Sequence, residues 1–175
     1  MNKFENPAKY LGEQLKIHGL TITTAESCTA GGVANSIASI AGSSDYLVGG
    51  VVTYATEAKY KLLNVSPNTV NEHNGVSATV ALEMATGAMN LFKTDVAIGI
   101  TGIAGPSDDG EERPAGTIYI CVAIKTKKTL AFPDVIRVLN CNFNSHNRAD
   151  NINNAIYNAV LIAGDEVSKA FPTIR

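Results

Sequence analysis

Residues 20–33 read LTITTAESCTAGGV, and two different patterns of apolar residues meet within them. Residues 20–24 are apolar and rich in β-branched side chains, a composition that predicts a buried strand. Apolar residues then recur at helical spacing over residues 29–40, which predicts a helix. Ser27 therefore lies in a tight turn between a strand and a helix, where the start of the helix leaves backbone N–H groups unpaired.

The same alternation of strands and helices continues along the chain. Asn6 and Pro7 mark the start of a helix that Gly19 ends. Further strands are expected at residues 46–54, 96–101, 117–124 and about 129–140, and further helices at residues 57–63, 77–91 and about 148–170. Pro133 makes the last strand an edge strand or a bulged one. The chain is thus expected to form an α/β sheet covered on both faces, and its late antiparallel pair makes this sheet mixed.

Composition narrows the class of protein. The 175 residues, 45% apolar and 17% charged, fit one domain spanning residues 1–175. A formal net charge of −2 argues against direct nucleic-acid binding. Three cysteines without CxxC spacing predict neither a disulfide framework nor a zinc site. The N-terminus is polar and the apolar runs are short, so we expect a cytoplasmic protein without a signal peptide or membrane span.

Chemically useful residues follow the expected strands. In open α/β sheets, ligands bind beyond the carboxyl ends of the strands, where the loops after Thr24, Tyr54 and Thr101 are expected to converge. Ser27 lies in the first of these loops, and Lys59 follows the second. A serine activated by a lysine is a known variant of triad chemistry. The pattern favours a hydrolase of amides or esters that uses no catalytic histidine.

Lys59 can act as a base only if its amine loses its proton easily. With Thr56 as the N-cap, Lys59 is the third residue of its helix, where the helix dipole disfavours a positive charge. Asn64 and Pro67 are expected to close this helix. The alternative interpretation is an ordinary solvated lysine, and Tyr54 has a similar alternative as a strand residue at the rim.

The turn around Ser27 also allows other interpretations. Ser27 or Thr29 can serve only as a helix cap. Cys28 is a rival nucleophile, because a thiolate is activated at a helix N-terminus. Its base would have to be one of three scattered histidines, His18, His73 and His146.

A second glycine-containing loop leaves the third strand. Residues 101–106 read TGIAGP, and the two glycines allow backbone N–H groups to face a phosphate or carbonyl oxygen. The loop lacks the Gly-Lys-Ser/Thr ending of a Walker motif. Residues 107–112 follow as an acidic loop, with Arg113 as the basic residue beside it.

Taken together, several motifs closely resemble the C-terminal domain of the CinA family. They are AESCT at 25–29, GSS at 42–44, GVVTY at 50–54 with EAK at 57–59, VS at 76–77 and TGIAGP at 101–106, and the resemblance covers residues 11–170. It implies a three-layer α/β/α sandwich with a five-stranded mixed sheet and a deamidase of nicotinamide mononucleotide (NMN). It also implies a homodimer or higher homo-oligomer, with no metal and no cofactor.

Matching positions imply roles for individual residues. Ser27 would be the nucleophile, Lys59 its base and Tyr54 an assisting group. The implied substrate-binding residues are Cys28, Thr29, Ala30, Gly31, Ser44, Thr101, Gly102, Ile103, Ala104, Gly105 and Arg148, of which Arg148 would suit a phosphate. The alternative from another class is a noncatalytic nucleotide-binding or competence-related interaction domain.

Overall fold

The computed structural model describes residues 3–108, 113–145 and 147–172, so His146 and most of the acidic loop lie outside the described residues. Five strands form one sheet in the order β2-β1-β3-β4-β5. They are β1 (Ile22–Glu26), β2 (Leu47–Val52), β3 (Val96–Gly102), β4 (Thr117–Ile124) and β5 (Val135–Asn142). β1, β2 and β3 run parallel, whereas β4 and β5 are antiparallel to their neighbours. The mixed five-stranded sheet is confirmed.

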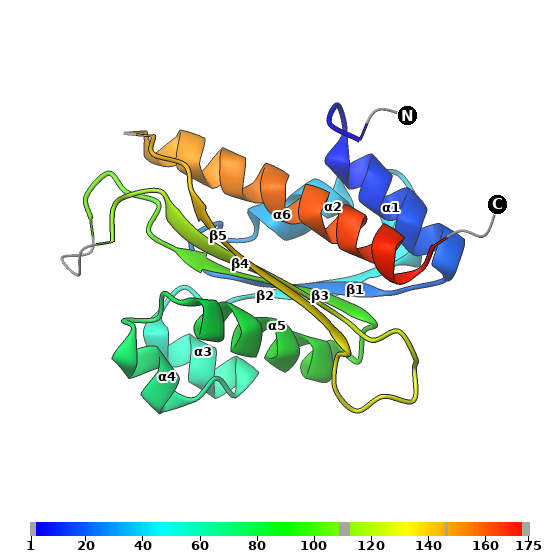
Figure 1. The fold of residues 1–175 in the computed structure, drawn as a ribbon, viewed down its shortest axis with the longest axis horizontal. Helices are drawn as coiled ribbons and strands as arrows, with labels where there is room; N and C mark the ends of the chain where they lie inside the picture. The colour runs from blue at the N-terminus through cyan, green and yellow to red at the C-terminus, as the bar shows by residue number, and fades with distance from the viewer. Residues whose placement is uncertain (1–2, 109–112, 146, 173–175) are drawn as a thin grey trace.

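Helices cover both faces of the sheet, which confirms the three-layer sandwich (Figure 1). One layer holds α1 (Pro7–His18), α2 (Gly32–Ala38) and α6 (Arg148–Ala170), and the other holds α3 (Thr56–Leu63), α4 (Pro67–Glu72) and α5 (Ala78–Phe92). A short 3-10 helix, η1 (Ser43–Asp45), precedes β2. None of the described helices is both long enough and apolar enough to span a lipid bilayer.

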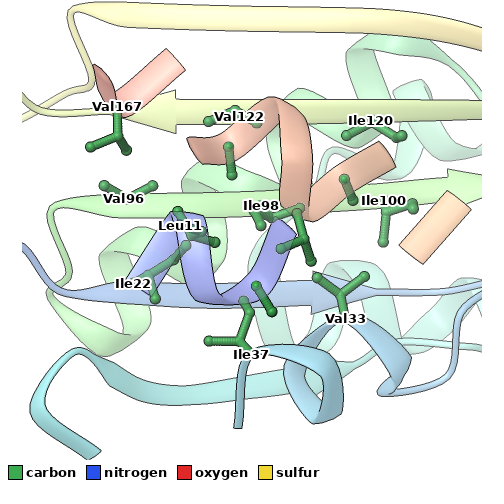
Figure 2. Close-up of a cluster of buried hydrophobic side chains, with 14 of the residues drawn as sticks. Leu11, Ile22, Val33, Ile37, Val96, Ile98, Ile100, Ile120, Val122 and Val167 are labelled. Atoms are coloured by element: carbon green, nitrogen blue, oxygen red, sulfur yellow. The ribbon is translucent and has the colours of Figure 1, made fainter. Parts of the chain in front are cut away.

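The larger core lies between the sheet and the layer of α1, α2 and α6. Figure 2 shows Leu11 of α1 near Ile22 and Ile98, Val33 of α2 on the side of Ile100, and Val167 of α6 on the side of Val96. Each of these side chains is fully buried, and such burial contributes about 1.5–3 kcal/mol per residue. This packing holds the three parallel strands in register, so their carboxyl ends form a fixed platform.

On the other face, α5 packs directly onto β3. A Cβ at Gly99 would lie 2.2 Å from the carbonyl oxygen of Ala81 and 2.7 Å from the amide nitrogen of Ala85. Only glycine allows this approach, because the atoms it would meet are backbone. The contact fixes α5, and with it the turn that precedes α5 at the carboxyl end of the sheet.

Two helices begin at different residues from those expected. α2 begins at Gly32 rather than at residue 29, because Ala30 and Gly31 adopt left-handed conformations. The N-cap of α3 is Ala55, and Thr56 is its first helical residue. Lys59 is therefore the fourth residue of its helix, not the third.

Two prolines also lie in different structural elements from those expected. Pro67 starts a helix that the sequence reasoning missed, α4, and Ser66 caps it by accepting a hydrogen bond from the Thr69 amide. Proline suits this first position because its missing N–H has no partner there anyway. Pro133 lies before β5, which begins at Val135, and β5 is an edge strand as predicted.

Candidate active site

The loops at the carboxyl ends of β1, β2 and β3 enclose a pocket of about 180 Å³. Eight of the predicted site residues line it: Ser27, Cys28, Tyr54, Lys59, Thr101, Gly102, Ala104 and Arg148. A larger groove of about 380 Å³ lies between α3 and α5, but neither Ser27 nor Lys59 lines it. We therefore take the smaller pocket as the candidate site.

At the base of this pocket, Lys59 reaches Ser27. The Lys59 Nζ lies 3.1 Å from the Ser27 Oγ and 2.9 Å from the Thr53 carbonyl oxygen. Ser27 comes from the turn after β1, whereas Thr53 follows β2 and Lys59 is on α3. Two crossovers of the sheet thus bring the hydroxyl and the amine together.

The Lys59 side chain is 3% exposed, which is unusual for a lysine. Its burial lowers the pKa of the amine below its usual value, and a weaker interaction with Cys28 acts in the opposite direction. No salt bridge to Lys59 occurs among the described residues. A buried lysine without a carboxylate partner can exist as the neutral amine, which is the form that accepts a proton.

Beneath the Ser27 turn, the Glu26 carboxylate binds the backbone N–H groups at the start of α2. Its buried carboxylate accepts hydrogen bonds from the amides of Gly31, Val33 and Ala34 at 2.8–3.0 Å. It also accepts from the Thr29 hydroxyl at 2.7 Å. The carboxylate therefore caps α2 internally and holds the turn rigid, because it satisfies the N–H groups that the helix leaves open.

The hydrogen bonds to Glu26 reduce the number of donors that the predicted binding residues can direct at a ligand. The donors of Thr29 Oγ1 and Gly31 are bound to Glu26, and the Ala30 amide donates to the Ser27 carbonyl oxygen at 3.1 Å. Thr29, Ala30 and Gly31 do not line the pocket. Among the described residues, the amides of Cys28 and Thr29 have no acceptor in another residue. Of the two, only Cys28 lines the pocket, so its amide is the available donor for an oxyanion in the turn.

Cys28 lines the pocket, but its thiol has the properties of a core side chain. It is buried, and burial raises its pKa to about 12. An activated thiolate has a lowered pKa instead. The structure thus disfavours Cys28 as the nucleophile.

Arg148 extends across the mouth of the pocket from the first turn of α6. Its Nη2 donates to the Tyr54 Oη at 2.9 Å, and its Nη1 donates to the Gly105 carbonyl oxygen at 2.7 Å. Arg148 and Tyr54 are both exposed, and no carboxylate pairs with Arg148 in the described part of the chain. The N-terminus of α6 and the guanidinium both favour an anion at this mouth.

Asn151 ties the two loops around Arg148 together. Its side chain is 0% exposed, and its Nδ2 donates to the carbonyl oxygens of Ala104 and Ser145 at 3.0 and 2.9 Å. Its Oδ1 accepts from the Ser145 amide at 3.3 Å. Asn151 therefore fixes the loop after β3 to the start of α6. The sequence reasoning did not single it out, because a lone asparagine in a helix carries no distinctive pattern.

The turn between α4 and α5 supplies a further wall that sequence reasoning missed. Asn74, Gly75 and Val76 line the pocket, as does Thr56. The Thr101 Oγ1 donates to the Gly75 carbonyl oxygen at 2.7 Å. The Asn-Gly pair is a turn signal, but it does not indicate that the turn faces a serine far away in sequence.

Three other predicted residues lie outside the pocket lining. Ser44 is exposed in η1, before the start of β2, whereas the pocket lies beyond the end of that strand. The Ile103 amide donates to the Thr117 carbonyl oxygen, and the Gly105 carbonyl oxygen accepts from Arg148. Ile103 and Gly105 thus shape the loop, while Ser44 lies at the opposite end of β2.

Comparison with known proteins shows what the chain resembles. The family model of the CinA C-terminal domain matches residues 5–165, so the chain belongs to this family. It is 46% identical over 116 residues to the nicotinamide-nucleotide amidohydrolase PncC of Escherichia coli K12, a match that spans 66% of this chain and 70% of that protein. It is 47% identical over 119 residues to a CinA-like protein of Chloroherpeton thalassium, of which it matches 28%.

Solved structures agree with the fold. A CinA superfamily protein from Klebsiella pneumoniae superposes with a TM-score of 0.85 at 30% identity, over 97% of this chain and 99% of that one. The competence/damage inducible protein CihA from Agrobacterium tumefaciens gives a TM-score of 0.83 at 29% identity, over 94% and 97%. Both similarities extend over nearly the whole chain.

Proposed function

We propose that this protein is an amidohydrolase that converts NMN to nicotinic acid mononucleotide and ammonia, a step of pyridine-nucleotide salvage. The observation that carries the proposal is the buried Lys59 amine 3.1 Å from the Ser27 hydroxyl. The similarity to an amidohydrolase of nicotinamide nucleotides supports the choice of substrate. The reaction needs a nucleophile, a base and a site for a phosphate, and the pocket contains candidates for all three.

In the first half of the reaction, Ser27 attacks the carboxamide. One N–H of the neutral Lys59 amine donates to the Thr53 carbonyl oxygen, which leaves the nitrogen lone pair to accept the Ser27 proton. The Ser27 Oγ then bonds to the carboxamide carbon, and the amide of Cys28 is our candidate for stabilising the oxyanion. Lys59 returns the proton to the amide nitrogen, the C–N bond breaks, and ammonia leaves.

In the second half, water hydrolyses the acyl-enzyme. Lys59 accepts a proton from the water, whose oxygen bonds to the acyl carbon. The bond to the Ser27 Oγ breaks, and Ser27 regains its proton from Lys59. The product is the pyridine carboxylate. No metal is needed for these steps, because proton transfer and oxyanion stabilisation both come from protein groups.

The rest of the nucleotide would lie toward the mouth of the pocket. The 180 Å³ enclosed near Ser27 suits the pyridine carboxamide more than a whole mononucleotide. Arg148 and the N-terminus of α6 would then bind the phosphate. Tyr54, which is 58% exposed, would orient Arg148 through its hydroxyl.

Ammonia release from NMN by the purified protein tests this proposal. We expect Ser27→Ala and Lys59→Ala each to lower kcat by about 10³-fold or more, and Cys28→Ala to retain most of the activity. Unchanged activity in Ser27→Ala would reject the nucleophile. Saturable binding of NMN without turnover by the wild-type protein would favour the noncatalytic binding module instead.

The assembly and location of the protein are further proposals. The edge strand β2 exposes Val48 and Val52, a surface suited to the homodimer that the family resemblance implies. Three free cysteines suit a reducing cytoplasm. Sedimentation equilibrium would test the homodimer, and a single monomeric species at micromolar concentration would contradict it.

A further inference from the structure

The turn between α4 and α5 lies against the Lys59 side chain. Asn74 and Gly75 both have left-handed backbones, with φ of 47° and 74°. A Cβ at Gly75 would lie 3.6 Å from the Lys59 Cε and 3.9 Å from its Nζ. The backbone of this turn is therefore one wall around the amine, and its position controls how much water reaches that amine.

The carbonyl oxygens of this turn accept hydrogen bonds from side chains that belong to neither α4 nor α5, the two helices that the turn joins. The Thr101 Oγ1 donates to the Gly75 carbonyl oxygen at 2.7 Å. The Arg113 Nη1 donates to the His73 carbonyl oxygen at 2.9 Å and also to that of Val76. Thr101 is the last residue but one of β3, and Arg113 precedes β4, so the end of β3 and its connection to β4 anchor the turn at three points.

We propose that Arg113 is a positioning residue that, together with Thr101, holds the turn of residues 73–76 against Lys59 and keeps its amine dehydrated and directed at Ser27. The inference rests on the proposed function, because it concerns how the base is prepared. Arg113 does not line the pocket, so its effect on Lys59 passes through the backbone of the turn.

A loosened turn is expected to change the pKa of Lys59. Burial is the main cause that lowers the pKa of Lys59, so water admitted by a loosened turn raises this pKa again. Each unit of increase lowers the neutral fraction about tenfold at a pH below the pKa. The substitution does not remove the other ionisable groups that line the pocket with Lys59, which are Cys28 after β1, Tyr54 after β2 and Arg148 on α6. It also keeps His73 in the turn and Glu57, Tyr60 and Lys61 on α3.

The first test is the pH profile of NMN hydrolysis by Arg113→Met, which keeps the long side chain but removes the donors. The control is Arg137→Met, which removes an exposed arginine from β5. We expect kcat/KM of Arg113→Met to fall about tenfold at pH 7 and to approach the wild-type value near pH 10. Arg113→Lys, which keeps a cationic donor, is expected to recover part of the loss, and Arg137→Met is expected to match the wild type.

Two results of this test would overturn the proposal. One is an equal loss at every pH, which would indicate a merely structural role. The other is a profile of Arg113→Met identical to that of the wild type. If Arg113→Met does not fold, as judged by circular dichroism, Thr101→Val loosens the same turn and is expected to shift the profile in the same direction.

A second readout needs no turnover. The ¹³C chemical shift of the Lys59 Cε, followed against pH in lysine-labelled protein and assigned with Lys59→Met, reports the pKa of the amine directly. We expect Arg113→Met to raise this pKa by about one unit. If Arg113→Met raises the pKa of Lys59 but the wild-type protein does not hydrolyse NMN, the proposed function alone is rejected. An unchanged pKa in an active enzyme would reject the role of Arg113 alone.

Discussion

The Tyr54 hydroxyl and the Arg148 guanidinium, which lie 94 positions apart in sequence, are joined by a hydrogen bond of 2.9 Å. The bond links the end of β2 to the start of α6 across the mouth of the pocket. It presents a cation beside the enclosed space at Ser27. In the proposed function, the carboxamide of the substrate would bind inside the pocket and its phosphate at the mouth.

Arg148→Met is expected to reduce kcat/KM for NMN by about 10- to 100-fold, because a charge-assisted hydrogen bond contributes about 1.5–3 kcal/mol. The loss should be much smaller for nicotinamide riboside, which lacks the phosphate. Steady-state kinetics with both substrates measure the difference. Lys169→Met, at the other end of α6, is the matched control, and equal losses for both substrates would contradict a phosphate contact.

The wild-type enzyme is expected to gain activity as the pH rises through the pKa of Lys59. Burial lowers this pKa, so the rise should come below the usual lysine value of about 10.4. A profile of kcat/KM against pH measures it. A rate that is flat from pH 6 to pH 10 would show that no amine titrates in the reaction.

Lys59 also makes stability depend on pH. Between its lowered folded pKa and about 10.4, the unfolded chain holds a proton that the folded chain has lost, so stability rises with pH in this window. Below the folded pKa, both states are protonated and the full cost of the buried charge remains. Urea unfolding should therefore show the wild type gaining stability relative to Lys59→Met as the pH rises, and a constant difference would contradict this.

Glu26→Gln is expected to lower the free energy of unfolding by about 2 kcal/mol or more. The carboxylate accepts from five donors, and the NH₂ group of glutamine cannot accept any of them. Urea denaturation measures the loss, with the exposed Glu13→Gln on α1 as the control. Because the same carboxylate supports the Ser27 turn, kcat should fall as well. Wild-type stability in Glu26→Gln would mean that the amides of α2 find other acceptors.

Asn151→Ala is expected to cost about 3 kcal/mol of stability, because it leaves one buried carbonyl oxygen, one half-buried carbonyl oxygen and one amide without their partner. Asn154→Ala, which alters an exposed side chain of the same helix, should cost less than about 0.5 kcal/mol. Equilibrium unfolding compares the two variants. Similar stabilities would show that the loop after β3 does not depend on Asn151.

Much of the candidate site could be predicted because parallel strands carry their carboxyl ends to one edge of the sheet. Ser27, Tyr54, Lys59 and Thr101 each follow or end such a strand, and all four line the pocket. Helix boundaries were less predictable. Thr56 is a good capping residue, yet Ala55 is the cap, because Ala55 is the residue with an extended backbone (φ −71°, ψ 145°) and Thr56 is already helical.

The pattern of strands, helices and turn residues, which is local in the chain, was enough to determine the sandwich and the edge where Ser27 lies. Three contacts became visible in the folded chain alone: Glu26 caps α2, Asn151 joins two loops, and Arg113 and Thr101 hold the turn at Gly75. In each of these cases a side chain binds a backbone group. Every residue carries the same backbone groups, so the identity of the partner is not written in the sequence and depends on which segments the folded core brings together.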